Sequence, residues 1–205
     1  MRTDRGEVAR YLGLGRQPLP PELEEYARLC GQELDRLGPP RTVCRRLPVS
    51  ALPGRSRDLA RHLRRCQDCV LYAVTLGAET DRLLRRWSAQ SMAKAAVGQA
   101  VCAVRLDNLC ADLCEEIGKT LEEGGYLTPP FSPGYGDWDL SVQDRVLDLL
   151  SAHKRIGLTT TGGGMLVPEK SVTAVVGISD REEDACGQRC MRCRKTDCPF
   201  RAAPV

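Results

Sequence analysis

Aromatic side chains and long apolar runs are both scarce in this chain of 205 residues. Phe, Trp and Tyr together make up 4% of the sequence, so we do not expect a nucleic-acid surface that stacks bases on aromatic rings. No apolar run approaches the roughly 20 residues that cross a bilayer, and the first residues contain no stretch typical of a signal peptide. We therefore expect a cytoplasmic protein that binds neither nucleic acid nor membrane.

The charges that are present are unevenly placed. The net charge is +3 and charged residues make up 28% of the chain, as in an ordinary protein surface. Eight arginines, however, lie between Arg41 and Arg65. This cluster is typical of a basic face that meets an acidic protein or an anionic ligand. The length predicts one domain, or one and a half.

Hydrophobic periodicity and helix caps predict an α+β fold, because the expected strands do not alternate regularly with the expected helices. The expected helices cover residues 21–37, 57–65 after the cap Ser56, 78–123 with a break at 89–91, and a segment capped by Ser141. The expected strands cover residues 41–48, 70–75, 157–161 and 171–178, the last two on either side of the turn at 162–164.

One proline-rich loop, from Pro129 to Leu140, holds three of the rare aromatics: Phe131, Tyr135 and Trp138. Its prolines and glycines predict a stiff, kinked backbone. Aromatics on a fixed loop are typical of a ligand-binding site. The alternative is a plain turn whose aromatics cover the edge of a core.

This loop also carries a motif, Ser132-Pro133-Gly134-Tyr135-Gly136-Asp137. It resembles the activation domain of cobalamin-dependent methionine synthase, and more closely the stand-alone bacterial relatives of that domain. The resemblance extends over about residues 8 to 200. It includes Ile156-Gly157-Leu158-Thr159, Met165-Leu166-Val167-Pro168 and Gly177-Ile178.

The resemblance implies an α+β domain over residues 1–180, with a mixed or antiparallel sheet and flanking helices, that binds S-adenosylmethionine. In that family, an electron and a methyl group from S-adenosylmethionine restore methylcobalamin after cobalt(I) has been oxidised to cobalt(II). The implied partner is a corrinoid-binding methionine synthase or related methyltransferase, which supplies the cobalamin, and a flavodoxin-like protein is the implied electron donor. The residues implied to bind the ligand are Ser132, Pro133, Gly134, Tyr135, Gly136, Val176 and Gly177.

Two positions depart from the family pattern. The family motif has an arginine four residues before the glycine, where it pairs with the ligand's carboxylate, but this chain has Pro130 there. The stand-alone relatives tend to have an acidic residue near Gln99. An alternative function is therefore a ligand-free docking module for a corrinoid protein.

The chain has eleven cysteines, and four of them lie in a tail at residues 181–205: Cys186, Cys190, Cys193 and Cys198. Their close spacing predicts a metal site, either an iron–sulfur cluster or zinc, rather than four spare thiols. An iron–sulfur cluster would make an electron-transfer module a further alternative. Cys66 and Cys69 are expected to be partly buried thiols, and surface or helix-terminal positions are expected for His62 and His153.

Overall fold

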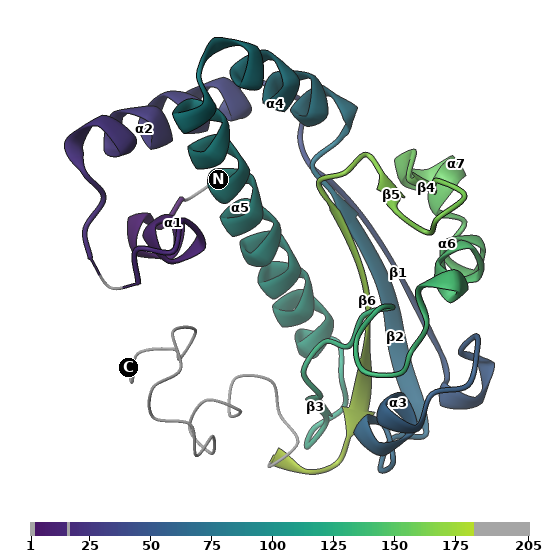
Figure 1. Ribbon diagram of the computed structural model, residues 1–205. Coiled ribbons are helices and arrows are strands. Elements are labelled where there is room, and N and C mark those ends of the chain that lie inside the picture. Colours follow the sequence, from purple (N-terminus) through teal and green to yellow (C-terminus); the bar gives the residue numbers. More distant parts are fainter. Residues whose placement is uncertain (1–2, 16, 183–205) are drawn as a thin grey trace.

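The computed structural model describes residues 3–15 and 17–182 (Figure 1). Its centre is a four-stranded antiparallel sheet in the order β1-β2-β6-β3. The strands are β1 (Arg41–Pro48), β2 (Asp68–Thr75), β6 (Ser171–Ser179) and the short edge strand β3 (Tyr126–Leu127). A separate hairpin joins β4 (Thr159–Thr160) to β5 (Leu166–Val167). The sheet is thus antiparallel and helices flank it, as the α+β prediction requires.

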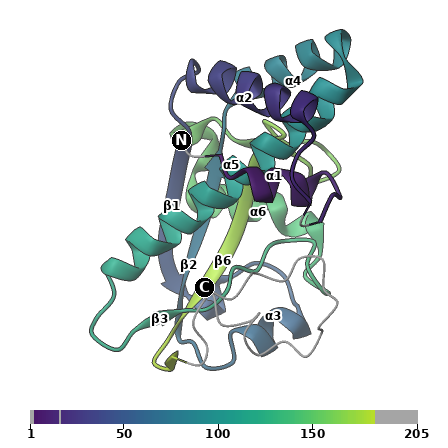
Figure 2. The ribbon, with the colours of Figure 1, turned by 90° about the vertical axis from the view of Figure 1, so that its left-hand side faces the viewer.

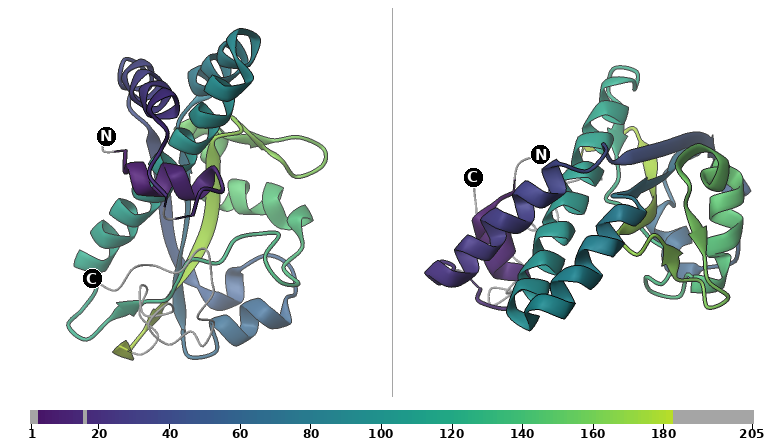
Figure 3. Two further views of the ribbon diagram at one scale, coloured as in Figure 1. Left: turned by 60° about the vertical axis from the view of Figure 1, so that its left-hand side comes forward. Right: turned by 90° about the horizontal axis from the view of Figure 1, so that it is seen from above.

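Helices cover both faces of the sheet, as the view from above shows (Figure 3). One face carries α1 (Arg5–Tyr11), α2 (Pro21–Asp35), α4 (Ala78–Gln90) and the long α5 (Met92–Lys119), with α2 and α4 standing beside α5 at one end of the sheet (Figure 2). The other face carries α3 (Arg57–His62), α6 (Gln143–Leu150) and α7 (Ala152–Ile156). The short 3-10 turns η1 (Val49–Ala51) and η2 (Leu140–Val142) precede α3 and α6.

The sheet separates two hydrophobic cores, and β2 contributes to both. Its residues Val70, Tyr72 and Val74 face the α5 side, whereas Cys69, Leu71 and Ala73 face the α3–α6 side. All six are buried, which explains why this strand reads as a continuous apolar run instead of an alternating one. By contrast, β1 lies at the edge of the sheet and exposes Arg41, Arg45 and Arg46.

Local signals set several element boundaries as predicted. Ser56 caps α3 by accepting from the Leu59 N–H at 2.9 Å. The predicted break between α4 and α5 is confirmed at Ser91, whose hydroxyl caps α5. The two helices then pack closely, because a Cβ on Gly98 would lie 2.3 Å from the Trp87 ring.

Two predictions of local structure were wrong. Ser141 does not cap a helix: it lies within η2, where its own N–H donates to the Asp139 carboxylate at 2.8 Å, and α6 begins at Gln143. The predicted strand at 157–161 is reduced to β4 and pairs with β5 rather than with β6. The glycine turn at 162–164 therefore joins β4 to β5.

None of the described helices is long and apolar enough to cross a membrane.

Candidate functional site

The aromatic loop is fixed to the edge of β6. The Thr128 N–H donates to the Gly177 carbonyl at 2.9 Å, and Phe131 pairs with Val175 through two hydrogen bonds of 2.9 Å. The chain therefore continues along the sheet edge beyond β3 as far as Phe131. The predicted loop and the predicted strand end, although more than forty residues apart, lie side by side.

Beyond Phe131 the loop folds into two consecutive turns. The Tyr135 N–H donates to the Ser132 carbonyl at 3.0 Å, and the Trp138 N–H donates to the Tyr135 carbonyl at 3.0 Å. The Gly134 N–H closes the loop by donating to the Trp138 carbonyl at 2.7 Å. Gly134 has φ +89° directly after Pro133, the arrangement that a type II turn requires of glycine. The backbone is thus stiff, as the composition predicts.

The aromatic residues of the loop divide into two groups. The Phe131 ring lies at the centre of a cluster, with ring centroids 5.3 Å from His62, 5.9 Å from Tyr135 and 6.2 Å from Trp138. Trp138 is 1% exposed and its indole N–H donates to the Pro53 carbonyl at 3.0 Å. Phe131 and Trp138 therefore cover the core on the α3–α6 face, which confirms the plain-turn interpretation for these two. Tyr135 is 58% exposed and belongs to the surface.

Asp137 attaches the loop to α3. Its carboxylate accepts hydrogen bonds from the Ser56 hydroxyl, from the Arg57 N–H at 2.9 Å and from the Asp58 N–H at 3.0 Å. These hydrogen bonds lower the pKa of Asp137 to about 2, and the bond from Ser56 has the largest effect. The negative charge at this helix start is therefore retained at neutral pH.

Gly136 brings the loop into contact with the same helix. A Cβ at this position would lie 2.5 Å from an Asp58 carboxylate oxygen and 3.0 Å from the Asp58 Cβ. Its φ is +53°, which also favours glycine. Ser132, Gly134, Tyr135 and Gly136 thus lie on a loop that is rigid before any ligand arrives.

The outer part of the loop carries two hydroxyl groups, that of Tyr135, which is exposed, and that of Ser132, which is half-buried. Neither has a hydrogen-bond partner among the residues that the structure describes. Gly134 is exposed between them, and Pro133 is buried beneath. A ligand at this surface would meet an aromatic ring, two hydroxyls and accessible backbone.

Val176 and Gly177 are placed differently from the loop residues. The Val176 side chain is fully buried in the core on the α5 side. Both backbone groups of Gly177 are bonded to Thr128, since its N–H donates to the Thr128 hydroxyl at 2.8 Å. A Cβ on Gly177 would lie 2.5 Å from the Cys66 sulfur. These residues support the loop from inside the sheet, and ligand contact at either of them stays a prediction.

His62 is a residue of the site whose role the sequence did not indicate. It lies at the end of α3, as predicted, but its ring is tilted against Phe131. Its Nε2 lies 2.7 Å from the Pro129 carbonyl, to which it donates, and 3.2 Å from the Thr128 hydroxyl. The contact spans 67 residues, and no local pattern in the sequence signals it. His153 is exposed on α7.

The two residues that depart from the family pattern both have solvent-exposed surface. Pro130 is half-buried in the loop, and Gln99 is exposed on α5.

The basic helix α3 brings a guanidinium group close to the loop. Arg61, 72% exposed, lies 3.3 Å from the Asp58 carboxylate, which in turn contacts Gly136.

The predicted ligands Cys186, Cys190, Cys193 and Cys198 lie outside the described residues, so the tail site stays a prediction. Within residues 3–15 and 17–182, no group of three or more His, Cys, Asp or Glu side chains could hold a metal ion. Cys66 is half-buried, whereas Cys69 is fully buried, and burial raises its thiol pKa to about 12.

The fold is similar to that of a solved structure, the MetH reactivation domain bound to AdoHcy, with a TM-score of 0.56 and 16% sequence identity. The match covers 76% of this chain and 65% of that one. No protein-family model matches this chain, and no curated protein does either. The chain therefore has the α+β fold seen in the MetH reactivation domain, as the sequence motif around Gly134 predicts.

Proposed function

We propose that this chain binds S-adenosylmethionine and assists the reductive methylation of a corrinoid on a partner methionine synthase or related methyltransferase. The observation that carries the proposal is the conjunction of motif and fold. A specific loop sequence, Ser132 to Asp137, occurs in a chain whose fold is similar to a MetH reactivation domain bound to AdoHcy.

The geometry of the loop supports ligand binding. Its backbone is fixed by three internal hydrogen bonds and by the Asp137 contacts with α3. A preformed site loses little conformational entropy when a ligand binds. Tyr135, with most of its ring exposed, is the side chain that we expect to contact the sulfonium ligand, because the face of an aromatic ring attracts a cation.

The role of the protein would be to position the reactants, since S-adenosylmethionine supplies the methyl group and the partner's corrinoid receives it. Ser132 and Tyr135 would orient the ligand with their hydroxyls. Asp137 would hold the loop against α3, so that the sulfonium stays at one place on the surface. The electron would come from a flavodoxin-like donor or from an iron–sulfur cluster in the tail.

Calorimetric titration of S-adenosylmethionine and of S-adenosylhomocysteine into the full chain tests the binding step. We expect saturable binding that Tyr135→Ala weakens, while the matched control Tyr11→Ala, at the other exposed tyrosine, leaves it unchanged. An absence of heat and of any thermal shift at millimolar ligand would contradict S-adenosylmethionine binding.

Pro130 favours a second candidate function, a docking module for a corrinoid protein that binds no S-adenosylmethionine. A bidentate arginine–carboxylate contact contributes about 1.5–3 kcal/mol, so its absence weakens binding by roughly tenfold to a hundredfold. Pro130→Arg separates the two functions. If the site is a weakened ligand site, this variant binds S-adenosylmethionine more tightly than the wild type by about that factor. If the site has lost ligand binding altogether, one restored contact produces no measurable affinity.

A further inference from the structure

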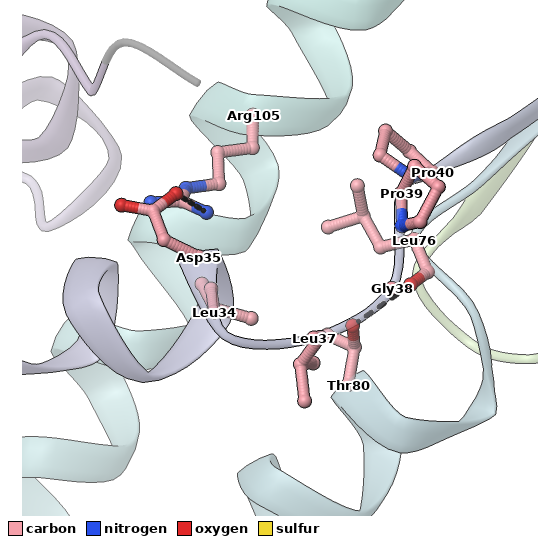
Figure 4. A pocket seen from close by; sticks show the side chains of 9 residues that line it. All are labelled: Leu34, Asp35, Leu37, Gly38, Pro39, Pro40, Leu76, Thr80 and Arg105. Carbon is pink, nitrogen blue, oxygen red and sulfur yellow. Dashed lines mark hydrogen bonds and ion pairs between the residues drawn. The ribbon is translucent and has the colours of Figure 1, made fainter.

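A small pocket lies at the opposite end of the sheet from the aromatic loop. Gly177, beside that loop, pairs with Cys69 at the start of β2, whereas the pocket includes Leu76, which follows the other end of β2. The pocket has a volume of about 160 Å³ and is lined by the end of α2, the segment 37–40, the start of α4 and Arg105 of α5 (Figure 4). It is much too small for a nucleoside, since pockets for ligands of that size begin at about 300 Å³.

The pocket contains a buried charge. The Arg105 side chain is only 4% exposed. Its guanidinium lies 2.9 Å from an Asp35 carboxylate oxygen, donates to the Gly31 carbonyl at 2.8 Å and donates to the Thr3 hydroxyl at 3.4 Å. A guanidinium has five N–H donors, so these contacts leave donors for a ligand. Asp35, in contrast, has a side chain that is 52% exposed at the edge of the pocket.

The remaining wall is mostly apolar. Figure 4 shows the Arg105–Asp35 pair on one side of the pocket, facing the side chains of Leu76 and of the two prolines across it. The apolar lining consists of Leu34, Leu37, Pro39, Pro40 and Leu76. Thr80 is the remaining polar side chain, and its hydroxyl already donates to the Leu76 carbonyl at 3.1 Å. One side of the pocket is therefore charged with both signs and the other side is hydrophobic.

From this arrangement we propose that the pocket binds an apolar α-amino acid of about the size of methionine or leucine. The α-carboxylate would accept hydrogen bonds from Arg105, and the α-ammonium would donate to Asp35, whose oxygens can each accept more than one hydrogen bond. The apolar side chain would lie against Leu37 and Leu76. A cavity of roughly 150 Å³ accommodates a group as large as benzene, which matches such a side chain.

The charged side of the pocket sets the preference for a zwitterion. Asp35 is the last residue of α2, and the carbonyl groups at a helix C-terminus carry partial negative charge. Two arginines already lie at this helix end, because Arg36 is the C-cap residue and Arg105 donates to the Gly31 carbonyl. The preference for an ammonium group therefore depends on the Asp35 carboxylate, and the preference for a carboxylate depends on Arg105. The pocket is separate from the aromatic loop, so this site is independent of S-adenosylmethionine binding.

The proposal is tested by calorimetry and thermal shift on the full chain with L-methionine and L-leucine. We expect saturable binding of both, and binding at least about tenfold weaker for the methionine analogues that lack either the amino or the carboxyl group. Asp35→Asn should weaken methionine binding by a similar factor. Glu25→Gln is the matched control, because Glu25 is also an exposed carboxylate of α2 paired with an arginine.

Leu37→Trp provides a second test that leaves the buried arginine intact, since a larger side chain would fill the pocket and abolish binding. Absence of binding at tens of millimolar amino acid would overturn the proposal. The proposal would also be overturned if Asp35→Asn and Glu25→Gln bound methionine with equal affinity. A deaminated analogue that binds as tightly as methionine would overturn it as well. Titration of S-adenosylmethionine into Leu37→Trp should match the wild type, which separates this site from the loop.

Discussion

Replacing Gly136 by alanine should destabilise the protein by about 1–2 kcal/mol. Two effects of comparable size contribute. A non-glycine residue at φ +53° costs about 1 kcal/mol. The new methyl group would also lie 2.5 Å from an Asp58 oxygen, so the Asp58 side chain must leave its rotamer, at a cost of about 1 kcal/mol. The smaller entropy of the unfolded alanine chain offsets a part of this, up to about 1 kcal/mol.

The matched control is Gly162→Ala, in the turn between β4 and β5. No atom lies within 4 Å of a Cβ built there, and its φ is not positive. Its free energy of unfolding should therefore stay within about 0.5 kcal/mol of the wild type. Urea unfolding followed by circular dichroism measures both variants.

The comparison also addresses the function, because Gly136 holds the loop against α3. If the loop must be preformed in order to bind, Gly136→Ala should weaken S-adenosylmethionine binding as well as folding, while Gly162→Ala changes neither. Equal stabilities of the two variants would refute the claim that the loop is tightly packed against Asp58.

Three further predictions concern the same framework. Gly98→Ala should destabilise the protein by about 1–2 kcal/mol, because the added methyl group would overlap the buried Trp87 ring, whereas Gly118→Ala, in the same helix with no atom within 4 Å of the added Cβ, should be neutral or slightly stabilising. The folded-state pKa of Asp137, about 2, is below its ordinary 3.8, so its contribution to stability is complete above pH 3.8 and should be lost as the pH falls toward 2. Asp137→Asn should flatten that part of a stability–pH curve, and an unchanged curve would show that the three bonds to α3 are not held in solution. Trp138→Phe should cost about 1–2 kcal/mol in urea unfolding, because it removes the donor to the buried Pro53 carbonyl, and a loss below about 0.5 kcal/mol would contradict that bond.

Elements with strong local signals were predictable from the sequence. The strand at Arg41–Pro48 has the predicted boundaries, because Pro39 and Pro40 end the preceding segment and β-favouring residues follow. The cap at Ser56 and the break at Ser91 were equally local, since each depends on a hydroxyl and the next three residues. The helix α1 was missed, although Asp4 caps it by accepting from the Gly6 and Glu7 N–H groups.

Features that depend on distant pairing were not predictable in the same way. The sequence does not indicate that Asp137, about eighty residues away, binds the first backbone N–H groups of α3. The contacts of His62 with Pro129 and of Arg105 with Asp35 each span about seventy residues. Such contacts follow from the fold, and a sequence can indicate them only after the sheet order is known.

The arginines of β1 have a consequence for how copies of this protein meet. An edge strand exposes unpaired backbone groups that can pair with the edge of another molecule. Here the long edge, β1, carries Arg41, Arg45 and Arg46, and the opposite edge, β3, is only two residues long. Two copies that approached through β1 would bring guanidinium groups of like charge together. The arginines of this strand thus disfavour edge-to-edge pairing of two copies, and the effect should weaken as salt screens the charges.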